Sequence, residues 1–267
     1  MSYTIADIER LLFKLYPAYD AESWDRCGLQ VGDRRAQVKK IAFSLNASVH
    51  TIDLAKQAGA NLLVAHHPIC IDMPFPLSNL ESGAHASAAA FYKAIQEDMH
   101  VISMHTNLDR SKEGAYALAR SLGFEPKEPY EQRYLPGKES WGRLGALVEL
   151  EEPISLSELH ERSWKRFNRR PMSYGDPQHS LKRILFLGGS LGSFADDAAS
   201  RGIDAVVTGE CSFHRAHDLK LSGVAVSVLG HDLSEMVLIE EIKKALMQKH
   251  VPSSYFVDID EGLSWWQ

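Results

Sequence analysis

The sequence predicts an α/β fold with a largely parallel sheet. Short apolar runs typical of strands alternate along the chain with segments whose apolar residues have helical spacing. A faint internal repeat also relates residues 39–66 to residues 182–209, because each stretch places a basic pair, a strand, a helix and a second strand at nearly the same spacing. Two copies are too few for a solenoid, so we expect a duplicated α/β unit.

The first half of the chain supplies the clearest elements. A helix is expected over residues 4–17, where apolar side chains recur at helical spacing and Thr4 is suited to cap the N-terminus. Apolar runs predict strands at 40–45, 62–66 and 100–104. Helices are expected between and after them, at 48–58, 82–97 and 113–122, with Ser48 as a cap and Gly59 as a stop.

Residues 125–141 are polar and rich in turn-forming residues, which indicates a connection between two units. We therefore expect a first unit over residues 1–125 and a second over residues 126–224. The second unit is predicted to have strands at 143–150, 182–187, 204–208 and 224–229. Its helices are expected after Ser155, between Gly192 and Gly202, and at 212–221, and a last long helix follows at 233–249.

Composition restricts the class of protein. The net charge of −6 argues against non-specific binding to nucleic acid or to an anionic membrane. No stretch approaches the ~20 apolar residues that a membrane span needs. The N-terminus lacks the basic and apolar regions of a signal peptide, and the three cysteines are scattered. We expect a cytoplasmic protein of 267 residues without a disulfide framework.

Adjacent histidines, His66 and His67, end a buried strand and precede Pro68. Ligand sites of open α/β sheets lie just outside the carboxyl ends of the strands. Successive strand side chains point to opposite faces, so both imidazoles reach one site only if the backbone turns there. We favour a metal-binding role over the alternative of a structural histidine pair.

Other strand ends also carry ligand-type residues. His105 and Asp109 follow the strand at 100–104, although Asp109 could instead cap a helix. His231 and Glu235 are four residues apart at the start of the last helix, on one helical face. The alternative for that pair is a solvated helix surface.

Glu210 lies just after the strand expected at 204–208 and precedes His214 and His217. This cluster predicts a role for Glu210 and His214 in proton transfer or in supporting the site. The alternative is an ordinary helix start, where the dipole favours an acid. Gly188 to Ser193 could cradle a phosphate, but the run matches no phosphate-binding motif, and a tight turn is favoured.

Together these motifs resemble the dinuclear-metal family often named GTP cyclohydrolase I type 2, the YbgI-like or Nif-three-like proteins. Five segments carry the resemblance in order and spacing: Trp24-Asp25 with residues 28–32, His66-His67-Pro68, residues 105–109, residues 208–210 with His214, and Gly230-His231 with Glu235. Three positions depart from the common pattern, namely Arg26, Asn46 and Asp232.

The resemblance implies that two metal ions are bound by His66, His67, Asp109, His231 and Glu235, with Glu235 or Asp109 bridging. It implies two intertwined α/β units with mixed sheets, in which residues 225–267 return to complete the first unit. It also implies a homohexamer built as a trimer of dimers. Imidazole and carboxylate ligands suit Zn, Fe, Mn or Co as the divalent ion.

The leading hypothesis is a metal-dependent hydrolase that acts on a nucleotide-like small molecule, with Glu210, His214 or His105 moving protons. The assignment to a GTP cyclohydrolase reaction rests on the resemblance alone. The alternative is a metal-binding regulatory or scaffold protein that acts through partner proteins without turnover.

Overall fold

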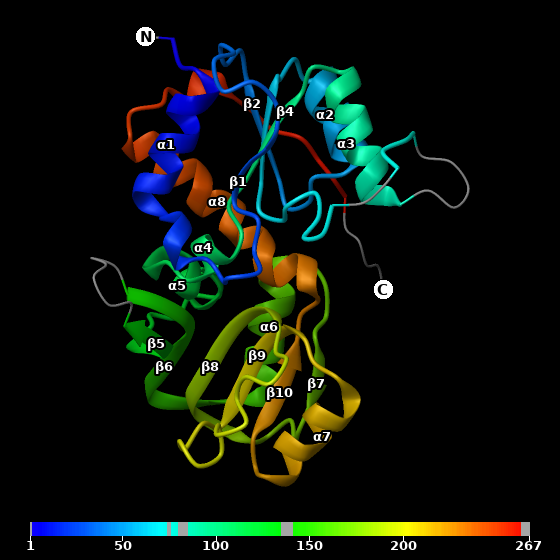
Figure 1. The fold of residues 1–267 in the computed structure, drawn as a ribbon. Coiled ribbons are helices and arrows are strands. Elements are labelled where there is room, and N and C mark those ends of the chain that lie inside the picture. The colour runs from blue at the N-terminus through cyan, green and yellow to red at the C-terminus, as the bar shows by residue number, and fades with distance from the viewer. Residues whose placement is uncertain (1, 74–75, 80–84, 135–140, 263–267) are drawn as a thin grey trace. The chain divides into compact units, whose positions relative to one another are not determined.

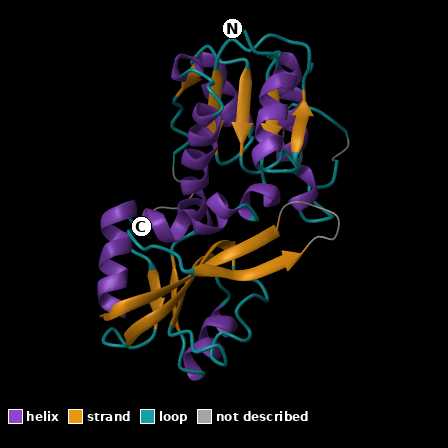
Figure 2. Cartoon of the chain, turned by 90° about the vertical axis from the view of Figure 1, so that its left-hand side faces the viewer, coloured by secondary structure: helices purple, strands orange, loops and turns teal. Residues whose placement is uncertain are grey.

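The computed structural model describes residues 2–73, 76–79, 85–134 and 141–262. The chain forms two compact units, of which the first comprises Met1–Leu108 and Leu238–Gly262 and the second Asp109–Val237. Each unit contains its own sheet and its own helices (Figures 1 and 2). The predicted boundaries at residues 125 and 224 stay predictions.

The first sheet has five strands in the order β1-β4-β3-β2-β11. Its strands are β1 (Gly28–Val31), β2 (Ile41–Ser44), β3 (Leu62–Ala65), β4 (His100–Ser103) and β11 (Phe256–Val257). Three of its strand pairings are parallel, namely β4–β3, β3–β2 and β2–β11. The edge strand β1 runs antiparallel to β4. Because β11 (residues 256–257) pairs with β2, a segment late in the chain completes the first sheet.

Helices cover both faces of this sheet, with α1 on one side and α2 and α3 on the other (Figure 1). The bounds are α1 (Ile5–Leu15), α2 (Val49–Gln57) and α3 (Ala86–Gln96), with short 3₁₀ turns at Ala18–Asp20 and Ser253–Tyr255. Thr4 and Ser48 cap α1 and α2 as predicted, each within a capping box. Residues 82–84 of the predicted third helix lie outside the described residues.

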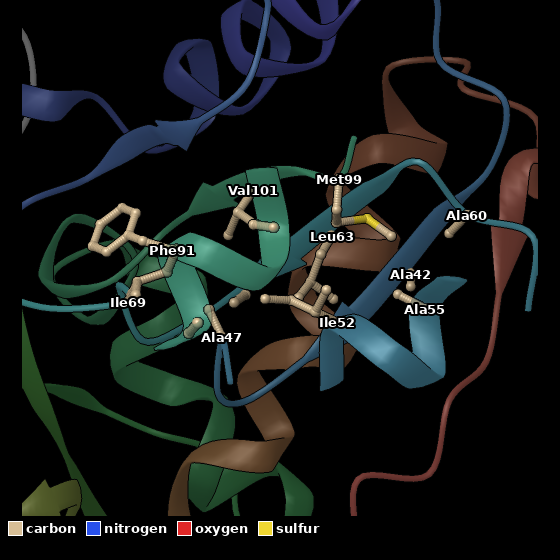
Figure 3. Close-up of a cluster of buried hydrophobic side chains, with 13 residues drawn as sticks. Ala42, Ala47, Ile52, Ala55, Ala60, Leu63, Ile69, Phe91, Met99 and Val101 are labelled. Carbon is tan, nitrogen blue, oxygen red and sulfur yellow. The ribbon is translucent and has the colours of Figure 1, made fainter. Parts of the chain in front are cut away.

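A cluster of buried side chains joins α2 and α3 to the sheet (Figure 3). Leu63 on β3 packs centrally in it, with Ile52 from α2, Phe91 from α3, and Met99 and Val101 around β4. Ile69 and seven alanines fill the remaining positions, and the small alanines allow the helices to approach closely. This packing fixes the carboxyl ends of the central strands.

The second sheet has six strands in the order β5-β6-β8-β9-β10-β7. Its strands are β5 (Glu128–Tyr134), β6 (Trp141–Ser155), β7 (Met172–Tyr174), β8 (Ser180–Ser190), β9 (Ala205–Glu210) and β10 (Ala225–Val228). The pairings β8–β9 and β9–β10 are parallel, and the other three are antiparallel. The predicted α/β class with mixed sheets is thereby confirmed.

The remaining helices are α4 (Thr106–Asp109), α5 (Lys112–Ser121), α6 (Leu156–Phe167), α7 (Phe213–Leu221) and α8 (His231–Gln248). The division between the two units falls within α4 and α8. Among the described residues, no helix combines the length and the apolar composition that a membrane span requires.

The internal repeat has a structural counterpart in each unit. Asn61 accepts a hydrogen bond from the backbone N–H of Lys39 at 2.7 Å, at the start of the parallel pair β2–β3. Asp204 accepts one from the N–H of Lys182 at 2.8 Å, at the same place in the pair β8–β9. The polar residue before the second strand therefore fixes the start of the first strand in both copies.

The structure corrects the prediction that residues 125–141 form only a connection. Residues 128–134 are strand β5, which pairs antiparallel with β6, while residues 135–140 lie outside the described residues. β5 is an edge strand whose side chains are mostly exposed. Its polar sequence suits an edge and hides the alternation that identifies a half-buried strand.

The helix predicted between Gly192 and Gly202 is also wrong. This segment is a series of turns with hydrogen bonds three residues apart, such as Phe194 N–H to Leu191 O at 2.9 Å and Gly202 N–H to Ala199 O at 3.0 Å. Ala195 has a left-handed backbone with φ of 68°, which a continuous right-handed helix does not allow. The repeat therefore preserves the two strands but not the helix between them.

A buried ion pair fixes the turn that joins β10 to α8 in the second unit. Arg169 donates through Nη1 to Asp232 Oδ2 at 3.0 Å and through Nη2 to Leu229 O at 2.9 Å. Its Nη2 also lies 2.5 Å from Asp232 Oδ1, so the contact is bidentate. Gly230 has φ of 99°, and a Cβ there would lie 2.1 Å from Arg169 Nη2. Glycine is thus required for both the turn and the ion pair.

Truncation of the first core should destabilise the fold strongly. Leu63→Ala should lower the free energy of unfolding by about 2–5 kcal/mol, because it opens a cavity among buried side chains. Ile95→Ala is the matched control, because it removes a side chain of similar size that is 61% exposed. This substitution should change the free energy of unfolding by less than about 0.5 kcal/mol. Urea unfolding measures both, and equal losses would contradict the assigned core.

Breaking the buried ion pair should also be costly. Arg169→Ala leaves the Asp232 carboxylate buried without its counter-ion and should lower the free energy of unfolding by about 3–5 kcal/mol. Lys127→Ala removes one partner of an exposed ion pair with Glu149 and should cost at most about 1 kcal/mol. Thermal and chemical unfolding of the two variants measure both losses. An Arg169→Ala variant with the same free energy of unfolding as the wild type would refute the assigned role of the ion pair.

Candidate metal-binding residues

His66 and His67 directly follow β3, whose four residues are all buried. Their backbone N–H groups donate to Ser44 O at 3.2 Å and Leu45 O at 2.9 Å, which holds the pair against the end of β2 and the residue after it. His66 is fully buried, and its Nδ1 lies 2.8 Å from Met104 O. The two ring centres are 4.9 Å apart, so the backbone does bring both imidazoles together.

Asn46, one of the departures from the family pattern, contacts the second histidine. Its Oδ1 lies 2.9 Å from His67 Nδ1. The Asn46 side-chain nitrogen and the N–H of Leu45 both face the Glu261 carboxylate, at 3.3 and 2.5 Å. This contact fixes the orientation of the amide, so that its oxygen is the atom that faces the His67 ring.

His105 follows β4, the next parallel strand, and contacts a buried carboxylate. Its Nδ1 lies 2.8 Å from Asp25 Oδ1, and the Asp25 side chain is fully buried. Asp25 also accepts hydrogen bonds from Thr106, including its backbone N–H at 2.9 Å. Burial raises the pKa of Asp25, but the hydrogen bonds and charge of His105, together with Thr106, outweigh it and hold the pKa well below its usual range.

The imidazoles of His66, His67 and His105 form one cluster in the first unit. The His105 ring centre lies 5.2 Å from that of His66 and 5.6 Å from that of His67. One nitrogen of each ring lies within 4.8 Å of the corresponding nitrogens of the others, a spacing that suits ligands of a metal ion. Sequence analysis predicted His66 and His67 as ligands and placed His105 only among the proton-transfer candidates.

The second unit brings together His231, Glu235 and Glu210. His231 opens α8, and its Nε2 lies 3.0 Å from Glu235 Oε2, one helical turn further on. Its Nδ1 lies 3.3 Å from Glu210 Oε2, at the end of β9. The hydrogen bond that His231 donates to Glu235, opposed by burial, raises the pKa of His231 to about 9. Both carboxylates thus face a single imidazole.

The close approach of Glu235 explains the glycine near the carboxyl end of β8. A Cβ on Gly189, whose φ is 64°, would lie 2.3 Å from Glu235 Oε1. The backbone N–H of Gly189 donates to Ser234 Oγ at 3.0 Å. Gly209 serves the same packing, because a Cβ there would lie 2.4 Å from Ser234 Oγ. These glycines allow the start of α8 to pack against the ends of β8 and β9.

Two other candidates lie on helices, Asp109 on α4 and His214 on α7. Asp109 is the last residue of α4 and is half-buried. His214 is exposed in the first turn of α7, where its ring packs edge-on against Phe213 at 5.5 Å. Glu210 belongs to β9 rather than to that helix, so Glu210 and His214 do not share a helical face.

Sequence analysis missed the partners that orient the histidines. It named Asp25 only within a motif that carries the resemblance, noted Asn46 only as a departure from the common pattern, and gave Arg169 no role. Asn46 directly follows the strand beside β3, and its position at the same sheet edge was the one signal that could have identified it. Arg169 lies 63 residues from Asp232, so no local pattern could pair them.

The chain is similar to curated proteins along most of its length. A protein of Clostridium acetobutylicum named GTP cyclohydrolase 1 type 2 homolog is 30% identical over 248 residues, which cover 92% of this chain and 90% of the relative. One of the same name from Streptomyces coelicolor is 29% identical, over 80% of this chain and 76% of the relative.

Solved structures share the fold over nearly the whole chain. Protein SA1388 of Staphylococcus aureus has a TM-score of 0.85 and 25% identity, covering 99% of this chain and 98% of that one. The protein ybgI has a TM-score of 0.77 and 24% identity, covering 97% and 99%.

Residues 3–260, almost the whole chain, match the sequence model of one family. The predicted resemblance is therefore confirmed, and the chain belongs to the Duf34/NIF3 (NGG1p interacting factor 3) family.

Proposed function

We propose that this protein is a metal-dependent hydrolase that binds two divalent ions through His66, His67, Asp109, His231 and Glu235. The observation that carries the proposal is the His66–His67 pair, in which both Nδ1 atoms face oxygen acceptors. Metal-binding histidines typically make such a contact through the other ring nitrogen, which fixes the ring and directs the second nitrogen to the ion.

The donor set fits the expected ions. Imidazole nitrogens and carboxylate oxygens suit Zn, Fe, Mn or Co, and Glu235 provides a buried carboxylate within 3.0 Å of the His231 ring. When bound, such ions supply Lewis-acid chemistry that lowers the pKa of bound water to ~7 and stabilises developing negative charge.

The polar residues around the ligands have separate roles in this proposal. Glu210 is half-exposed beside His231, where its carboxylate can accept or return a proton during hydrolysis. His214 is a second exposed candidate for proton transfer. Asn46 and the Arg169–Asp232 pair hold His67 and the turn before His231 in place.

A nucleotide-like small molecule is the proposed substrate, because curated relatives carry the name GTP cyclohydrolase 1 type 2 homolog. The family resemblance supports a homohexamer, built as a trimer of dimers, as the proposed assembly. We further propose a cytoplasmic location, and the net charge of −6 argues against direct binding to nucleic acid.

Metal content tests the ligand assignment. Elemental analysis of the purified protein should give about two transition-metal ions per chain. His66→Ala and His231→Ala should each lower that content, whereas His50→Ala, at an exposed position on α2, should leave it unchanged. Wild-type protein that contains no metal and takes up none on reconstitution would refute the proposal.

Turnover tests the hydrolase assignment. Metal-loaded protein should hydrolyse at least one member of a nucleotide panel that includes GTP. Glu210→Gln should lower kcat by about 10²-fold or more while metal content stays unchanged, because the substitution removes the proton acceptor. Glu125→Gln, at an exposed site, is the control. Metal-loaded protein without turnover on the panel would instead favour a non-catalytic metal-binding role.

A further inference from the structure

The three clustered histidines share one hydrogen-bonding pattern. In His66, His67 and His105 alike, Nδ1 is the ring nitrogen that faces an oxygen acceptor, at distances of 2.8, 2.9 and 2.8 Å. The acceptors differ in kind and in origin: a backbone carbonyl, an amide and a carboxylate, from Met104, Asn46 and Asp25. This common pattern makes Nε2 the ligand nitrogen in all three rings, if they bind metal.

Ring spacing agrees with a common ligand role. Three imidazoles on one tetrahedral ion, with metal–nitrogen bonds of ~2.0–2.1 Å, place their ring centres ~5 Å apart. The observed separations are 4.9, 5.2 and 5.6 Å. His105 is therefore as well placed relative to its two neighbours as they are relative to each other.

We propose that His105 is a further imidazole ligand beside His66 and His67, and that Asp25 is the residue that positions it. The inference rests on the proposed metal binding and extends its ligand set. It assigns His105 to metal binding rather than to proton transfer.

Asp25 is suited to this positioning role because its carboxylate is rigidly held. Besides the His105 ring, it faces the backbone N–H of Arg26 at 2.6 Å and that of Thr106 at 2.9 Å, together with Cys27 Sγ at 3.1 Å. A buried carboxylate fixed from several sides holds the ring in one tautomer and one orientation. It also increases the basicity of the ligand nitrogen.

Zn²⁺ affinity of the full-length protein, measured by competition with a chromophoric chelator at fixed pH, tests the proposal. His105→Ala should weaken binding by at least about tenfold, and Asp25→Asn, which keeps the size of the side chain, by about 10–100-fold. Adding free imidazole to His105→Ala should restore part of the affinity, which a purely structural loss would not allow. His50→Ala, on the surface of the same unit, should bind as the wild type does.

Wild-type affinity in folded His105→Ala would overturn the inference and leave the five-residue ligand set standing. If His105→Ala does not fold, Asp25→Asn decides, and affinity within twofold of the wild type would overturn the positioning role. A wild-type protein that binds no Zn²⁺ would refute the proposed metal binding itself.

Discussion

The parallel register of β2, β3 and β4 is the constraint on which the histidine cluster depends. Ser44 pairs with Ala65, and Ala65 pairs with Ser103, so the three strands end at the same level. The residues that follow them are therefore adjacent in space, although they are separated by about twenty to forty positions in sequence. Met104 and Asn46 can consequently fix the two rings of the His66–His67 pair, and His105 joins them from the third strand.

This constraint also explains how much could be predicted from the sequence. The strand before His66 is an uninterrupted apolar run, and the parallel α/β class follows from its alternation with helices. Once that class is assumed, polar residues at strand ends become candidates for a site, which singles out His66 and His67 in the first sheet and Glu210 in the second without any structural information. His231 and Glu235 follow from helical spacing, and the structure places them 3.0 Å apart.

Interactions between residues distant in sequence could not be predicted in this way. Asp25 contacts His105 across 80 positions, and Arg169 contacts Asp232 across 63, with no periodic signal for either pair. The edge strand β5 is polar because it is exposed, so its sequence is that of a loop. The turns between Leu191 and Gly202 depend on the left-handed backbone of Ala195, which cannot be predicted from the residue type because alanine rarely adopts it.

A crystal structure of the protein reconstituted with Zn²⁺, with anomalous data collected at the zinc absorption edge, tests the central claim most directly. The account predicts anomalous peaks for zinc at about 2.0–2.1 Å from Nε2 of His66 and of His67. Both Nδ1 atoms should keep their contacts with Met104 O and Asn46 Oδ1. The absence of a peak at these nitrogens, or zinc bonded to Nδ1 after the rings have turned, would contradict it.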